Sequence, residues 1–312
     1  MFSTDCEKMP GPTMPDIEGM PGFGMCSGMF NSSERVQVTI EALTLREIKG
    51  RFTLSGWMPL KNFTAPELKS VGEYMYITGM SLEYLDLSSL EEVGHMSISN
   101  SGVREIKHGQ LKRILGSKTG RTTEISMYGL PNLKSVDSWV SGPVSVQRID
   151  IDQAAADMTE LTIGALHVDE VVINGKGNLA LTFGTDDTKE MNLGKVQIRG
   201  LSDVKRNEKA ENIKVGTFDV QHNEFSRLDI PFDDLGMLYM MYESKLETLT
   251  LPRAATKYTN LTVAIWDCEK LDLKSEFVKG KNGEQRERGW YWPERDMGRI
   301  AIYNTSVDET LL

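Results

Sequence analysis

The sequence predicts an all-β protein, a parallel β-solenoid of ten to eleven coils with about 22 residues in each coil. Three observations lead to this fold class. A short strand pattern returns every 20 to 25 residues along most of the chain. A second apolar pattern follows the first within each repeat. No segment carries the apolar spacing of an amphipathic helix over three turns.

The strand pattern is an apolar residue at alternate positions, followed by Gly or Asn. Examples are Phe52–Gly56, Met75–Gly79 and Met96–Asn100. Gly and Asn tolerate positive φ, so each strand can end in a tight corner. The central apolar residues of the repeats are Leu54, Ile77, Ile98, Met127, Ile151, Ile173, Ile198, Val220, about Met240, Val263 and Ile302.

The second pattern spaces apolar residues at intervals of three and then two, as in Leu82, Leu85 and Leu87. The tetrapeptide Leu-Lys-Ser-Val at 68 and at 133 holds the same phase in two repeats. One strand of four or five residues cannot bury its apolar face alone. Stacked coils bury each apolar strip and pair each backbone with its neighbours, so we expect parallel strands one coil apart.

The chain divides into an N-terminal segment and one repeat domain. Residues 1–35 are rich in Met, Gly and Pro, which favours an irregular cap or arm. Residues 36–312 are expected to form a single β-solenoid domain. Longer gaps between strand patterns predict insertions at about 109–124 and 274–298.

Composition limits the classes of partner. The chain is 39% hydrophobic and 26% charged, which suits a thin solenoid with a large wet surface. Its formal net charge of −10 repels phosphate backbones, so we expect no nucleic-acid partner. No stretch of 18 apolar residues is present to span a membrane. No motif for a cofactor, a P-loop or a nucleophile elbow occurs, and we expect no cofactor and no metal.

The three cysteines have different expected roles. Cys6 and Cys26 lie in the loop-rich N-terminal segment and are candidates for a disulfide. Cys268 occupies a repeat position where other coils place Leu or Phe, which predicts a buried thiol.

Clustered carboxylates raise one enzymatic alternative. Asp150 and Asp152 flank Ile151 and can share one exposed strand face, with Asp157 nearby and Asp233–Asp234 further along. Some parallel β-helix enzymes cut polysaccharides with aspartates on one strand face. Outward polar positions of a strand explain the same pattern, and we favour that interpretation.

The repeat resembles the receptor L-domain, a leucine-rich-repeat-like right-handed solenoid. Residues 82–94 carry Leu-x-x-Leu-x-Leu-x-x-Leu-x-x-Val-Gly, and residues 65–72 carry Ala-Pro-Glu-Leu-Lys-Ser-Val-Gly. Within that class the chain is most similar to the fungal GPI-anchored cell-wall organisation proteins, which include sporulation-specific wall proteins. The pair Cys6 and Cys26 is also similar to that family. The resemblance covers roughly residues 36 to 275.

This resemblance implies a non-enzymatic cell-surface glycoprotein that supports fungal cell-wall organisation. Its expected partner is a cell-wall glycan or a surface protein, and it would touch the membrane only through an anchor not present in this chain. Extracellular or cell-surface localisation follows, with the targeting signals absent from this chain. The glycosylation sequons stand at Asn31, Asn62, Asn260 and Asn304.

One loop is a candidate for recognition. Trp290, Tyr291 and Trp292 lie in the second expected insertion. Exposed aromatic side chains there can stack on sugar rings or bind a protein, whereas a hairpin folded back onto the solenoid explains them equally well. An intracellular leucine-rich-repeat scaffold remains a further alternative to the surface glycoprotein.

Overall fold

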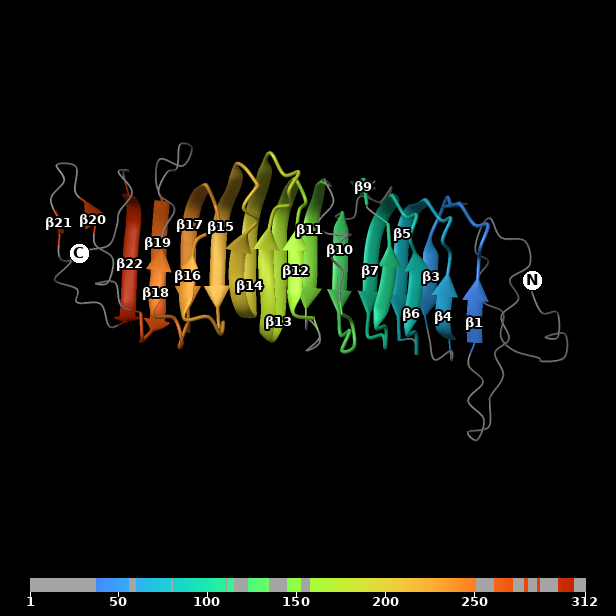
Figure 1. Cartoon of the computed structure of the whole chain (residues 1–312), viewed down its shortest axis with the longest axis horizontal. Coiled ribbons are helices and arrows are strands. Elements are labelled where there is room, and N and C mark those ends of the chain that lie inside the picture. Colours follow the sequence, from blue (N-terminus) through green and yellow to red (C-terminus); the bar gives the residue numbers. More distant parts are fainter. Residues whose placement is uncertain are drawn as a thin grey trace, which may run out of the picture.

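The protein is a parallel β-solenoid. The computed structural model describes residues 38–55, 60–79, 81–109, 111–114, 123–134, 145–152, 158–250, 261–271, 278–279, 285–286 and 297–305. Within these ranges there is no helix, and the chain makes about 9 turns of some 22 residues. Figure 1 shows successive coils side by side along the rod, from β1 towards one end to β22 towards the other. The predicted fold class is confirmed.

The turn count is slightly below the expected ten to eleven coils. Eleven successive strands lie along the main path of the long sheet, as many as the strand patterns in the sequence. The first and last coils are described only in part, so fewer complete turns than strands result.

A long sheet of 14 strands is the largest sheet of the rod. Its strands pair in parallel, each with the coil before and the coil after. Its members are β2 (Glu47–Ile48), β3 (Phe52–Ser55), β5 (Ser70–Thr78), β7 (Glu92–Ser99), β9 (Arg113–Ile114), β10 (Glu124–Tyr128), β11 (Ser145–Asp152), β12 (Glu160–Ile163), β13 (His167–Phe183), β14 (Met191–Arg206), β15 (Ile213–Gln221), β17 (Asp234–Met241), β19 (Leu261–Cys268) and β22 (Met297–Thr305).

Shorter sheets complete the coils. One contains β1 (Val38–Glu41), β4 (Leu60–Thr64), β6 (Tyr84–Leu87) and β8 (Glu105–His108), and another pairs β16 (Arg227–Asp229) with β18 (Thr248–Thr250). β20 (Val278–Lys279) and β21 (Gln285–Arg286) pair antiparallel, inside the region where the sequence predicts the second insertion. Residues 115–122 of the first expected insertion and residues 1–35 lie outside the described residues.

The strand register follows the predicted apolar columns. Leu54 pairs with Ile77, and Ile77 pairs with Ile98, with every partner buried. One assignment was wrong: the partner of Met240 is Ile265 rather than Val263. Both residues lie on the same inward face of the strand, two positions apart, so only the register of pairing with β17 decides between them.

Corners after the strands adopt positive φ. Gly79, Asn100, Gly129 and Gly200 do so, as the Gly/Asn pattern predicts. Three later coils place His222, Tyr242 and Asp267 at the same corner, with φ between 50° and 58°. A tyrosine in this region is uncommon, because Cβ crowds the following carbonyl, whereas His and Asp adopt it more often.

The repeated Val-Gly of the sequence has a steric cause. At Gly194 and Gly216 a Cβ atom would lie 2.5 Å from the carbonyl oxygen of Asp169 and Gly194, in the preceding coil. Gly72 and Gly94 face a preceding carbonyl in the same way. The coils kink here and approach too closely for any side chain, so glycine recurs with the coil period.

One continuous apolar core runs through the rod from Ile48 to Leu271. Around it, ion pairs join side chains that lie 21 to 24 residues apart, one coil from each other. Such exposed pairs add at most about 1 kcal/mol each, but they penalise a slipped register. These pairs are Arg46–Glu67, Arg51–Glu73, Lys61–Glu83, Lys112–Glu91, Arg113–Glu92, Lys189–Glu211, Lys209–Asp186, Lys214–Glu190 and Lys245–Glu224.

Candidate functional site

The candidate site is the outer face of the main wall. The main wall is the stretch of each coil that aligns with Leu54 and Ile77, and it passes through β3, β5, β7, β10, β11, β13, β14, β15, β17, β19 and β22. Along each strand alternate side chains point into the core, so the remaining ones form parallel columns on the solvent side. These columns change in chemistry along the rod.

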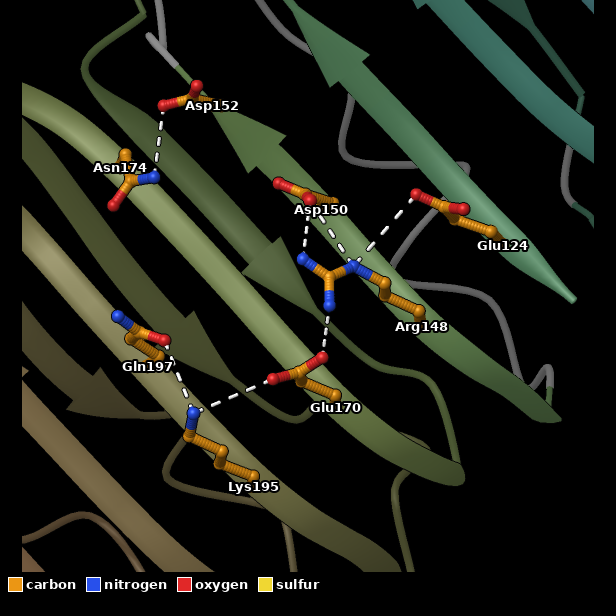
Figure 2. Close-up of polar contacts among 8 residues, drawn as sticks. All are labelled: Glu124, Arg148, Asp150, Asp152, Glu170, Asn174, Lys195 and Gln197. Atoms are coloured by element: carbon orange, nitrogen blue, oxygen red, sulfur yellow. Dashed lines mark hydrogen bonds and ion pairs between the residues drawn. The ribbon is translucent and has the colours of Figure 1, made fainter. Parts of the chain in front are cut away.

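Over β10 to β14 one column alternates in charge. Glu124, Arg148, Glu170 and Lys195 are consecutive partners in register. Arg148 contacts the carboxylates of Glu124 and Glu170 on either side and donates Nη2 to Asp150 at 2.7 Å. Lys195 lies 3.6 Å from Glu170. Figure 2 shows the guanidinium in the middle of this network.

The network holds its charges in place. The hydrogen bond with Asp150 raises the pKa of Arg148 above its ordinary value, which keeps the guanidinium charged. Asp152, two residues further along β11, accepts a hydrogen bond from Asn174 Nδ2 at 3.0 Å (Figure 2). Asp150 and Asp152 are both half-buried outward residues of one strand, as the sequence predicts. Each carboxylate therefore has a protein partner.

The other carboxylates named from the sequence lie apart from this pair. Asp233 contacts Arg206 Nη1 at 2.6 Å and accepts the backbone N–H of Ile213 at 2.8 Å. Asp234 is buried at the start of β17, four strands along the sheet from β11. Asp157 lies outside the described residues.

A polar chain follows on the next strands. Arg199 Nη2 donates to Gln221 Oε1 at 2.9 Å, and Gln221 Nε2 donates to Asp219 Oδ1 at 2.7 Å. Arg199 is in β14, and the other two side chains are in β15. One positive and one negative charge balance across the amide, so this part of the face has no net charge.

Aromatic and thioether side chains follow on β17 and β19. The rings of Tyr239 and Trp266 lie 4.8 Å apart, and the Tyr239 hydroxyl lies 3.1 Å from Met241 Sδ. At the adjoining corner the rings of His222 and Tyr242 stack at 4.9 Å with an interplanar angle of 13°. Both corner residues are exposed, Tyr242 by 45%.

Inside the same corners lies a buried polar column. Asn223 accepts the backbone N–H of Leu201 at 2.9 Å and donates its own N–H and its side-chain amide to Glu243. Glu243 is 0% exposed, and burial raises its pKa to about 7. The thiol of Cys268 is buried as predicted, and burial raises its pKa to about 11.

Two sequons fall on described strands. Asn62 is a half-buried residue of β4, and its side-chain amide donates to Thr39 Oγ1 at 3.3 Å. Asn304 lies in β22. The remaining residues named from the sequence lie outside the described residues: Asn31, Asn260, Cys6, Cys26, Trp290, Tyr291 and Trp292.

A groove of about 520 Å³ lies away from the main wall, between the end of β14 and β16. Its charged lining includes Lys205, Arg206, Arg227 and Asp229. Arg206 contacts Asp233 and Arg227 contacts Asp229, so the groove's arginines are already paired within the chain.

Sequence reasoning missed the outer-face network, the aromatic corner and Glu243. A signal existed for the first: Glu124, Arg148, Glu170 and Lys195 alternate in charge at intervals of 22 to 25 residues. The sequence gives no signal for the burial of Glu243, because an acidic residue after a corner resembles a residue of a surface turn.

Over the ranges that the structure covers, no helix is long and apolar enough to cross a membrane. In those same ranges no group of three or more His, Cys, Asp or Glu side chains is arranged to hold a metal ion. Comparisons of this chain with protein-family models, with curated proteins and with solved structures find no match.

Proposed function

We propose that the chain is a non-enzymatic cell-surface glycoprotein of the receptor L-domain type that supports fungal cell-wall organisation. The solenoid serves as a stiff scaffold, and the outer face of the main wall is its recognition surface. Glycan or protein of the cell wall is the proposed partner class. The resemblance of residues 60–94 to the repeats of fungal wall proteins motivates the biological setting.

The outer face is the observation that carries the binding role. Over seven strands from β10 to β19 it presents aligned columns without a covering layer of other described strands. Its acidic side chains are held by neighbours, such as Asp150 by Arg148 and Asp152 by Asn174. A fixed surface of this kind suits recognition, because little side-chain order must be gained on binding.

The carbohydrate-active enzyme is the weaker alternative. It assigns the acid and base to Asp150 and Asp152. Arg148 binds the carboxylate of Asp150 and the amide of Asn174 binds that of Asp152, and these contacts within the wall favour a structural role for both. Release of reducing ends from pectin or β-glucan that is lost in Asp150→Asn would support the enzyme instead.

The test of the proposed function uses the native host. Surface biotinylation of intact cells should label the protein, and enzymatic removal of N-glycans should lower its mass. Asn62→Gln removes the sequon on β4 and should abolish the part of that shift that Asn62 carries. A protein that is neither labelled nor glycosylated would instead be the intracellular leucine-rich-repeat scaffold.

A further inference from the structure

The aromatic end of the outer face breaks the local rule of the solenoid. Earlier corners use Gly79, Asn100, Gly129 and Gly200, whose small or amide side chains suit positive φ. His222 and Tyr242 replace them in two consecutive coils with rings in the same strained conformation. Backbone strain of this kind costs about 1–3 kcal/mol and concentrates at functional positions.

The two corner rings directly follow β15 and β17, and β17 and the next strand, β19, carry two more rings. Tyr242 follows Met241 directly, and Met241 is the register partner of Trp266. Tyr239, one column away, contacts the Trp266 ring. The four rings of this surface, His222, Tyr239, Tyr242 and Trp266, thus come from three neighbouring strands and the corners that follow them. We call it the aromatic corner.

Polar groups border the aromatic corner on one side. Gln221 precedes His222 in the chain and links Arg199 to Asp219 by hydrogen bonds of 2.9 and 2.7 Å. These three hydrogen-bonded side chains offer donors and acceptors at fixed positions, and the charges of Arg199 and Asp219 cancel. The rest of the protein is acidic, with a net charge of −10, and so repels anionic ligands.

We propose that the aromatic corner binds a neutral glycan chain. A pyranose ring has a C–H-rich face that packs on an aromatic ring and a rim of hydroxyls that needs donors and acceptors. Sites that combine aromatic walls with a few fixed polar groups bind such amphipathic ligands. The one acidic side chain at the next corner, Asp267, and the acidic chain as a whole repel anions, so a neutral glycan suits this surface better than an anionic one.

This inference rests on the proposed function, since it names the ligand of the same face. The experiment is isothermal titration of the full chain with laminarihexaose and with chitohexaose, two neutral linear sugars, and with polygalacturonate as an anionic comparison. Wild-type protein should bind at least one neutral sugar and should bind polygalacturonate at least tenfold more weakly.

Two variants test the assignment of the site. Trp266→Ala and Tyr242→Gly should each weaken binding at least tenfold, and glycine at position 242 relieves the positive φ, so that variant should fold. The matched control is Tyr128→Ala, which removes an outward tyrosine of the same face, 37% exposed, far from the corner. Circular dichroism confirms the fold of each variant.

Several outcomes would overturn the proposal. These are no binding of either neutral sugar, equal binding of polygalacturonate, or binding that Tyr242→Gly leaves unchanged. A protein that is labelled at the cell surface and glycosylated but binds no sugar would refute the glycan site alone. A protein partner that binds only at the Tyr128 region would place recognition elsewhere on the outer face.

Discussion

Asn223 donates both its backbone N–H and its side-chain amide to the carboxylate of Glu243, one coil further along the rod. The amide contact is 3.0 Å, and neither side chain is exposed to solvent beyond 2%. No ion pair joins Glu243 to a cation among the described residues, and such a buried carboxyl is a costly feature because burial disfavours its charged form.

Stability should therefore fall as the pH rises from about 4.5 to neutrality. Glu243 has a folded-state pKa of about 7 against an ordinary value of 4.5, so the folded chain holds this proton more tightly than the unfolded chain. The contribution is fully present below pH 4.5, declines between these values and is lost above pH 7. The loss amounts to at most about 3 kcal/mol.

Glu243→Gln tests this directly by urea unfolding at pH 4.5, 6 and 8. The glutamine keeps an acceptor for Asn223 and cannot ionise, so the difference between wild type and variant should grow with pH in favour of the variant. Glu247→Gln, at an exposed position, is the control and should show no such trend. Parallel curves for wild type and Glu243→Gln would contradict the assignment.

Gly200→Ala should destabilise the protein by about 2–4 kcal/mol, because it adds αL strain and an overpacked contact. The new Cβ would lie 2.5 Å from the carbonyl oxygen of Gly175, and the residue has φ +62°. Gly50→Ala is matched to it, since no atom lies within 4 Å of its added Cβ. Thermal unfolding should separate the two, and equal melting temperatures would show that the corner tolerates a side chain.

Arg148→Met should cost about 1 kcal/mol at low salt and less at high salt, since the guanidinium is 34% exposed and partly screened. The loss leaves Glu124 and Asp150 without this cation, while Glu170 keeps only its contact with Lys195. Arg46→Met removes a single pair whose arginine is 76% exposed and should have no measurable effect. Unfolding at 50 mM and 500 mM NaCl provides the comparison, and a salt-independent difference would argue against the network.

Cys268 should react slowly with thiol reagents in the folded protein. Burial raises its pKa to about 11, so little thiolate exists at neutral pH, and the side chain is closed to solvent. In a Cys6→Ser/Cys26→Ser background, Ellman's reagent should modify this single thiol rapidly only after unfolding in guanidinium. Fast modification of the native variant would mean that the C-terminal coils open readily.

The core positions of the rod were predictable from the sequence, because the coil period fixes where apolar residues must recur. Phe52–Leu54 and Met75–Ile77 take the predicted phase, and the Val-Gly kinks recur where coils approach closely. The sequence could not predict whether Val263 or Ile265 pairs with Met240, since both side chains are apolar and point inward. Pairing with a neighbouring strand, rather than any local property, decides such a case.

The outer face was harder to predict. Polar residues at outward positions carry no apolar period, so the contacts of Arg148 and of Gln221 depend on which columns the register brings together. Tyr242 contradicts the residue preference of its corner, and a rule based on Gly or Asn finds neither Tyr242 nor His222. Such departures from local preference become visible only when the backbone is known.

The parallel pairing of each coil with only its two neighbours also determines how the rod responds to force. Pulled from its two ends, it should unfold one coil at a time rather than all at once, because the strands of the long sheet's main path pair only with those of adjacent coils in the part of the chain that the structure describes. Each released coil of some 22 residues would lengthen the chain by about 70 Å. A molecule built in this way yields under tension in steps and can rewind when the tension falls.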